Sequence, residues 1–141
     1  MVKNLILIAI IDDHQLVRET WKFLLETDPY LQVIALCSSG AEAIEAAVTL
    51  NPDIMLMDIN MHPMNGFEAT SEVLKVNPSI KIIGVSVNNQ VSYARNILDA
   101  GARGYVTKNS SREEMIKAIK LVYEGQIYIC EEIRGKMADN I

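Results

Sequence analysis

Five polar residues of this 141-residue chain follow short apolar runs, and their types suit one kind of chemistry. Three are carboxylates, one is a hydroxyl and one is an ammonium group: Asp12, Asp13, Asp58, Ser86 and Lys108. Carboxylates that lie close together repel one another and raise their own pKa values unless a cation shares the site. Mg²⁺ prefers oxygen ligands and usually combines one or two carboxylates with waters and phosphate oxygens. The set therefore predicts a magnesium-dependent site for phosphoryl transfer.

Three of these groups have a specific predicted role in phosphoryl transfer. Asp58 is the predicted nucleophile toward phosphorus, because the metal and Lys108 together offset the charge of the incoming phosphoryl oxygens. Ser86 donates a hydrogen bond to a phosphoryl oxygen, which links the chemistry to a change of shape. Taken singly, an Asp at a strand end is usually a helix cap and a Lys is usually solvated. Five such groups at the ends of strands are harder to attribute to capping.

The elements that must position these residues alternate along the chain. Short apolar runs, typical of buried parallel strands, are separated by longer segments with helical apolar spacing. The predicted strands are 5–11, 31–36, 54–57, 80–87 and 104–106. The predicted helices are 14–27, 39–50, 65–76, one that begins at Val91 and ends at Gly101, and one that begins at Ser110 or Ser111 and ends at Gly125. The pattern predicts an α/β fold, (βα)5, with a doubly wound parallel sheet of five strands.

In open sheets of this class, ligands bind beyond the carboxyl ends of the strands. The five polar residues are all predicted to lie there. Residues 1–125 form the predicted domain, and residues 126–141 are expected to be a hydrophobic elbow followed by a charged tail.

Composition narrows the class of protein. Thirteen basic residues against eighteen acidic ones give a net charge of -5, which does not provide the broad basic face that nucleic acid requires. The apolar residues 5–11 run directly into Asp12 without a cleavage site, and no other stretch approaches the roughly 18 apolar residues of a membrane helix. We therefore expect a cytoplasmic protein without a membrane segment, whose Cys37 and Cys130 are buried thiols.

The motifs that carry these residues resemble those of response regulator receiver domains, the CheY-like fold, over residues 4 to about 125. They are Ile11-Asp12-Asp13-His14, Met57-Asp58-Ile59-Asn60-Met61 with Met64-Asn65-Gly66, Val85-Ser86-Val87, and residues 101–108. The resemblance implies a strand order of 2-1-3-4-5. It also implies that a sensor histidine kinase phosphorylates Asp58, and that Asp12, Asp13, Asp58 and the backbone carbonyl of Asn60 hold Mg²⁺. Ser86 and Tyr105 would be the switch pair.

Two details, residues 101–105 and the Tyr-Glu-Gly-Gln-Ile-Tyr run at 123–128, are similar to the LuxR/NarL/FixJ branch of two-component transcriptional regulators. Members of that branch continue into a linker and a helix-turn-helix domain. DNA would then be contacted only through a domain absent from these 141 residues. The alternative is a stand-alone receiver that acts through protein contacts. Tyr93, Ile97 and Tyr105 are expected either to serve a homodimer formed on phosphorylation or to belong to the core.

One departure from the family concerns the loop after Asp58. His62 stands where the family usually has proline, and Pro63 comes one residue later. The loop is therefore expected to differ in shape. His62 is expected to be an exposed loop residue, with a proton donor or an additional metal ligand as the alternative.

The sequence does not favour three other kinds of protein. A nucleotide-binding enzyme would need a GxGxxG or GxxxxGK[ST] motif after the first strand, and neither is present. An aspartate-nucleophile phosphatase would want its nucleophile after the first strand and a lid domain. An interaction module without phosphorylation would not need all five groups. We expect a phosphoacceptor switch, which catalyses its own phosphorylation and dephosphorylation, rather than an enzyme with a separate substrate.

Overall fold

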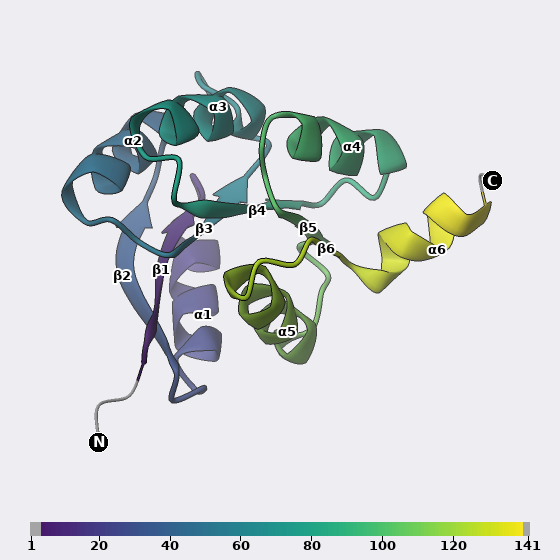
Figure 1. Ribbon diagram of the computed structural model, residues 1–141, viewed down its shortest axis with the longest axis horizontal. Helices are drawn as coiled ribbons and strands as arrows, with labels where there is room; N and C mark the ends of the chain where they lie inside the picture. The colour runs from purple at the N-terminus through teal and green to yellow at the C-terminus, as the bar shows by residue number, and fades with distance from the viewer. Residues whose placement is uncertain (1–3, 140–141) are drawn as a thin grey trace.

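The structure is a computed structural model that describes residues 4–139, in which six parallel strands form one sheet (Figure 1). The strands are β1 (Ile6–Ile11), β2 (Leu31–Cys37), β3 (Ile54–Asp58), β4 (Lys81–Ser86), β5 (Gly104–Thr107) and β6 (Tyr128–Ile129). The helices are α1 (Gln15–Leu25), α2 (Gly40–Thr49), α3 (Gly66–Val76), α4 (Val91–Asp99), α5 (Arg112–Tyr123) and α6 (Glu131–Asp139).

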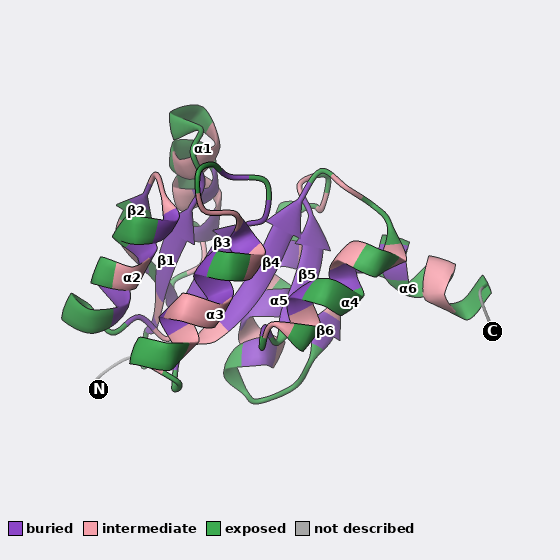
Figure 2. Cartoon of the chain, turned by 90° about the horizontal axis from the view of Figure 1, so that it is seen from above, coloured by how far each residue is buried: buried purple, intermediate pink, exposed green. Residues whose placement is uncertain are grey.

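Helices cover both faces of the sheet, as the alternation of elements predicts. Helices α1 and α5 lie on one face, and α2, α3 and α4 lie on the other (Figure 1). The inner strands β1, β3, β4 and β5 are almost entirely buried between these layers, whereas the edge strand β2 is partly exposed and the outer faces of the helices are exposed (Figure 2). Every residue of β3 is buried, which explains why its sequence is apolar without alternation up to Asp58.

The sheet order corrects one prediction. The order is β2-β1-β3-β4-β5-β6, so the predicted 2-1-3-4-5 arrangement is present but the sheet has six strands, not five. Tyr128 N–H donates to the carbonyl of Arg103 and Cys130 N–H donates to the carbonyl of Tyr105, each at 3.0 Å. A strand of two residues has no periodicity to detect, and its existence depends on the open edge of β5.

The expected elbow and charged tail also contain an additional helix, α6. Its residue Ile133 is fully buried and joins the core. The remainder of α6 is mostly exposed and charged, which gives this segment the composition of a solvated tail. One buried residue in a nine-residue helix is too weak a pattern to predict packing from sequence.

Some helix ends follow from local side chains. Ser39 accepts from the N–H of Glu42 at 3.2 Å, which confirms it as the cap of α2, and Ser111 accepts from the N–H of Glu114 at 3.0 Å at the start of α5. Gly101 has a φ of 113°, in the left-handed conformation predicted for it after α4. Helices α1 and α4 begin without a side-chain hydrogen bond at the cap, so capping does not account for where they start.

The residues considered for pairing divide between core and partial exposure. Ile97 and Tyr105 are fully buried, so these two belong to the core. Tyr93 is partly buried and packs edge-on against Phe67, with ring centroids 5.7 Å apart. Cys37 and Cys130 are both buried, as expected. Among the helices of residues 4–139, none combines the length and the apolarity needed to cross a membrane.

Candidate functional site

The sheet brings four of the predicted strand-end positions to one edge. Asp12 follows β1, Asp58 is the last residue of β3, Ser86 is the last residue of β4, and Lys108 follows β5. The strands between them are in parallel register, with Asp58 opposite Val85 and Ser86 opposite Thr107. Parallel strands present their carboxyl ends on the same side, so distant residues meet there.

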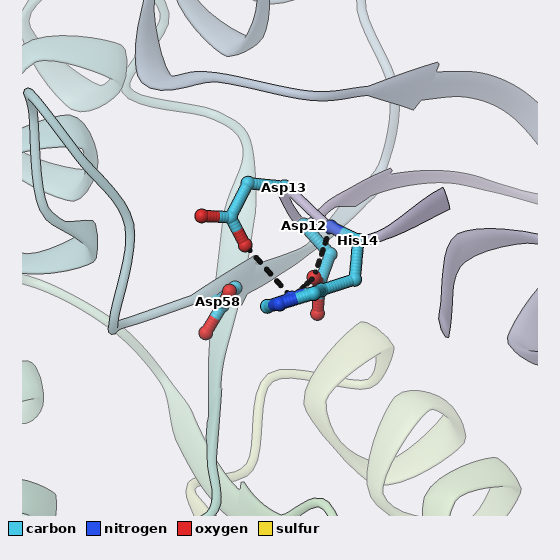
Figure 3. Close-up of side chains that lie close together, drawn as sticks. All are labelled: Asp12, Asp13, His14 and Asp58. Atoms are coloured by element: carbon cyan, nitrogen blue, oxygen red, sulfur yellow. Dashed lines mark hydrogen bonds and ion pairs between the residues drawn. The ribbon is translucent and has the colours of Figure 1, made fainter. Parts of the chain in front are cut away.

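Asp12, Asp13 and Asp58 form an acidic cluster together with His14, as Figure 3 shows. One ligand atom from each residue lies within 4.8 Å of the others. Asp12 and Asp58 are buried, whereas Asp13 and His14 are exposed, so the cluster opens toward solvent on one side. The predicted convergence of three carboxylates is therefore present.

His14 is a member of the cluster that the sequence interpretation did not use. Its Nδ1 lies 2.9 Å from Oδ1 of Asp13 and 3.2 Å from Oδ1 of Asp12 (Figure 3). The only available signal was its position directly after the two aspartates. His62, in contrast, is exposed and lies outside this cluster, which agrees with its reading as a loop residue.

Lys108 supplies the positive charge of the site. Its Nζ lies 2.9 Å from Oδ2 of Asp12 and 3.5 Å from Oδ1 of Asp58, and its side chain is only 17% exposed. Burial by itself lowers the pKa of a lysine, but the contacts with Asp12 and Asp58 outweigh burial and raise the pKa of Lys108. Lys108 therefore remains a fixed cation beside both buried carboxylates.

The two oxygens of Asp58 have different surroundings. Oδ1 accepts a hydrogen bond from the N–H of Asn60 at 3.1 Å, whereas Oδ2 is buried and has no hydrogen-bond partner among residues 4–139. Burial and the nearby charge of Asp12 raise the pKa of Asp58, and Lys108 and the N–H of Asn60 only partly oppose them. The carboxylate thus carries a charge that the protein alone does not fully compensate.

An Asp58→Asn variant is expected to be more stable than the wild type in metal-free solution at neutral pH, by about 1–3 kcal/mol, because it removes an incompletely compensated buried charge. A carboxyl whose pKa is raised by folding binds its proton more tightly when folded. The wild type therefore loses stability as pH rises from the ordinary Asp pKa through the raised value, and the deficit is complete above it. Urea unfolding with EDTA at several pH values measures the difference.

The advantage of the variant should disappear below the ordinary pKa of Asp and reach a plateau above the raised pKa of Asp58. Asp99→Asn, which changes an exposed carboxylate of α4, is the matched control and should leave stability nearly unchanged. A less stable Asp58→Asn protein at pH 7 would contradict the electrostatic description of the site.

Ser86 and Tyr105 both form a hydrogen bond with the loop that follows β4. Ser86 Oγ donates to Oδ1 of Asn60 at 2.7 Å and accepts from the N–H of Asn88 at 3.0 Å. The hydroxyl of Tyr105 donates to the carbonyl of Asn88, and burial raises the pKa of this tyrosine to about 12. The predicted switch pair is therefore connected through one loop residue, Asn88.

A groove lies on α1 beside Lys108. It has a volume of about 230 Å³ and is lined by Leu16, Val17, Thr20, Trp21 and Lys108. The side chain of Leu16 is prominent on this surface, because the residue is 76% exposed. An exposed apolar surface next to a charged pocket is a common feature of protein contact sites.

The residues present fit a divalent metal ion of the magnesium type. The donor set is dominated by carboxylate oxygens, and the buried Oδ2 of Asp58 lacks a partner among the described residues. Hard cations prefer such oxygen ligands and tolerate an open side occupied by waters or phosphate. The acidic pocket is thus chemically suited to Mg²⁺.

One family profile and two proteins of known sequence match most of this chain. The sequence profile described as the response regulator receiver domain matches residues 8–120. The transcriptional regulatory protein DegU of Brevibacillus brevis is 41% identical over 127 residues, which are 90% of this chain and 54% of that protein. Response regulator GacA of Pseudomonas viridiflava is 39% identical over 134 residues, which are 95% of this chain and 63% of that protein.

Solved structures agree with the sequence relationships. A two-component response regulator of the LuxR family from an Aurantimonas species is 30% identical, with a TM-score of 0.91, and the match covers 95% of this chain and 96% of that one. The chain spans less than two thirds of the length of the DegU and GacA proteins that it matches.

Proposed function

The chain belongs to the response regulator receiver domain family, and we propose that it is switched by a phosphoryl group on Asp58. The observation that carries this assignment is the state of the Asp58 carboxylate. It is buried beside Asp12 and Lys108, with Oδ1 held by a backbone N–H and Oδ2 left unpartnered among the described residues. A carboxylate oxygen without a partner has no hydrogen bond to lose when it forms a bond to phosphorus.

The proposed reaction makes one bond and breaks one. An oxygen of Asp58 attacks the phosphorus of the donor, and the bond between phosphorus and the donor's leaving group breaks, so that an acyl phosphate forms. Lys108 holds a positive charge 3.5 Å from Oδ1 and offsets the negative charge that arrives with the phosphoryl oxygens. Water later cleaves the acyl phosphate, which restores the carboxylate and releases inorganic phosphate.

Receiver domains as a family bind Mg²⁺ at an acidic pocket. We assign the ion here to Asp12, Asp13, Asp58 and the backbone carbonyl of Asn60. When bound, it would offset the charge of the carboxylates and polarise the phosphoryl oxygens. The alternative of a metal ligand from His62 has no support, because His62 is exposed and outside the cluster.

The response to phosphorylation is assigned to Ser86 and Tyr105. Ser86 Oγ has to exchange the hydrogen bond that it donates to Oδ1 of Asn60 for one to a phosphoryl oxygen, because a hydroxyl has one proton to donate. The N–H of Asn88, which donates to the same Oγ, then follows the hydroxyl. Such an exchange moves the loop after β4, whose residue Asn88 also accepts from the Tyr105 hydroxyl. A local change of hydrogen bonding is thereby passed to β5.

Incubation of the protein with Mg²⁺ and acetyl phosphate should add the mass of one phosphoryl group, as measured by intact mass spectrometry. The same treatment of Asp58→Asn should add none, because the nucleophilic carboxylate is absent. An adduct of equal yield on the variant would place the acceptor elsewhere, and no adduct on the wild type would count against the switch.

Receiver domains obtain their phosphoryl group from sensor histidine kinases, and we assign the same donor class to this chain. A kinase that delivers a phosphoryl group to Asp58 must approach the open edge of the sheet. The apolar groove on α1 lies at that edge, since Lys108 lines both the groove and the acidic pocket. Leu16 is therefore the proposed anchor for the kinase.

Leu16→Ala should slow phosphotransfer from the kinase about tenfold, because truncation of an interface anchor weakens binding by roughly 1–2 kcal/mol. Phosphorylation by acetyl phosphate should not change, since Leu16 does not contact Asp58. Val48→Ala, at an exposed position on α2, is the control for loss of exposed apolar surface. Equal rates for wild type and Leu16→Ala with the kinase would exclude this docking surface.

The output is proposed to be transcription, by analogy with relatives such as the transcriptional regulatory protein DegU. In this proposal residues 1–125 are the receiver domain, and residues 126–141, which include β6 and α6, lead toward a DNA-binding domain. The alternative is a receiver that acts through protein contacts alone. The reading frame of the gene beyond codon 141 distinguishes the two.

A cytoplasmic location and a homodimer formed on phosphorylation complete the proposal. Size-exclusion chromatography with and without beryllofluoride tests the dimer.

A further inference from the structure

Helix α6 is tied to the loop between β4 and α4 by polar contacts. Glu132 accepts from the side-chain amide of Asn89 at 3.0 Å and from the hydroxyl of Thr107, at the end of β5, at 3.2 Å. Lys136, one turn further along α6, donates to the carbonyl of Asn89 at 3.1 Å. Two charged side chains of one helix therefore hold a single loop residue from both its side chain and its backbone.

The loop held in this way is the one that adjoins the phosphorylation site. Asn88, the neighbour of Asn89, donates its N–H to Ser86 and accepts from Tyr105 through its carbonyl. Its side chain accepts from the N–H of Gln90 at 2.8 Å, which fixes the turn into α4. A displacement of Asn88 therefore displaces Asn89, whose contacts are with α6.

We propose that Glu132 and Lys136 form a latch that holds α6 against the β4–α4 loop, and that phosphorylation of Asp58 opens it. The term latch denotes these two side chains and their contacts with Asn89 and Thr107. The proposal rests on the assignment of Asp58 as phosphoacceptor. It adds the route by which the event at the strand ends reaches the C-terminal helix.

The construction of α6 suits an element that is released. Its buried anchor is Ile133, while Glu131, Glu132, Arg134 and Gly135 are exposed. Figure 1 shows that α6 lies at the end of the sheet, away from α1, α2 and α3. Hydrogen bonds and ion pairs at exposed positions contribute little stability. Segments with few buried contacts are those that open locally at low free-energy cost. A small displacement of the loop is therefore sufficient to alter the equilibrium between docked and released α6.

Thermodynamic linkage makes the latch act in both directions. If phosphorylation favours release of α6, then release of α6 must favour the phosphorylated arrangement of the site. Removing the latch should therefore strengthen binding of beryllofluoride, an analogue of the phosphoryl group, at Asp58. Trp21 provides the readout, because it is the only tryptophan and lines a small cavity with Asp12 and Asp58.

The first test uses the unaltered protein and hydrogen exchange read by mass spectrometry. Addition of Mg²⁺ and beryllofluoride should accelerate exchange of the α6 amides about tenfold relative to Mg²⁺ alone. Peptides from β1 and β3 should not accelerate. Normal beryllofluoride binding, seen by Trp21 fluorescence, with unchanged exchange in α6 would overturn the latch while leaving Asp58 as the acceptor. Failure of beryllofluoride to bind would overturn both assignments.

The second test compares Glu132→Ala with Glu131→Ala. Glu131 precedes Glu132 on the same helix, its side chain is 78% exposed, and its contact is with Arg134 at 3.8 Å, so this variant controls for loss of charge. Glu132→Ala should show fast α6 exchange without beryllofluoride and bind beryllofluoride about fivefold more tightly, a coupling of the usual allosteric size. Wild-type affinity and wild-type exchange in Glu132→Ala would overturn the proposal. If alanine unfolds the protein, Glu132→Gln removes the charge with the shape retained, and is judged by the same two readouts.

Discussion

Replacing Lys108 by methionine is expected to destabilise the metal-free protein by about 3 kcal/mol. The lysine lies between two buried carboxylates, at 2.9 Å from Asp12 and 3.5 Å from Asp58. Removal of one partner from a buried ion pair leaves an uncompensated charge, which typically costs 3–5 kcal/mol. The lower end of about 3 kcal/mol applies because the pocket is open on the side of Asp13 and His14, where water can enter.

The same substitution should slow phosphorylation by acetyl phosphate about 100-fold, the usual effect of removing one group that stabilises developing negative charge. Urea unfolding with EDTA measures the stability, and intact mass against time measures the rate. Added Mg²⁺ should recover part of the lost stability, since a cation replaces the missing countercharge. Lys117→Met, at an exposed position of α5, removes the same charge outside the pocket. A Lys108→Met protein as stable as this control would show that the cluster does not depend on the lysine.

Asp58→Asn combined with Lys108→Met separates the two electrostatic contributions. Asparagine removes the carboxylate whose pKa is raised by burial and by Asp12, so the lysine has less charge left to offset. The double variant should therefore be more stable than Lys108→Met alone. Residues that contact one another are not expected to have additive effects.

The candidate site was predictable from sequence because its positions are set by local features. A buried parallel strand is a short apolar run, and the residue at its carboxyl end is the first polar one. Asp58 could therefore be placed at the end of β3, and Asp12 directly after β1, without knowledge of tertiary packing, whereas Lys108 comes after the polar Thr107 that ends β5. Parallel strands then bring such ends together whatever the intervening helices contain.

The features that were not predicted depend on contacts between distant residues. The two residues of β6 form a strand only because β5 offers an open edge, and Ile133 is buried only because α6 returns to the core. His14 has an ordinary sequence context, and its contacts with Asp12 and Asp13 depend on its side-chain direction. For Ile97 the sequence left two interpretations open, because helical apolar spacing fits a docking face as well as a core. In the structure Ile97 is fully buried, so it belongs to the core.

The final prediction concerns the contact between the start of α3 and the loop that carries Asp58. Gly66 is the first residue of α3, and a Cβ atom there would lie 2.4 Å from the carbonyl oxygen of Asp58 and 2.5 Å from Cα of Ile59. Both neighbours are backbone atoms, which cannot rotate away as a side chain can. Gly66 also donates its N–H to the carbonyl of Ile59 at 2.9 Å, so this close approach is hydrogen-bonded. Glycine at this position therefore permits α3 to support the acceptor loop.

Gly66→Ala is expected to destabilise the protein by about 3 kcal/mol, the upper range for overpacking against atoms that cannot give way. It should also weaken beryllofluoride binding, because relief of the clash moves the backbone of Asp58. Gly135→Ala is the matched control, since nothing lies within 4 Å of its added Cβ and it sits in the exposed helix α6. That variant should gain up to about 1 kcal/mol from the higher helix propensity of alanine. It is the control for stability only, because α6 is the helix that the latch couples to beryllofluoride binding. Urea unfolding and Trp21 fluorescence measure both effects, and equal stability of the two variants would contradict the role given to the close approach at Gly66.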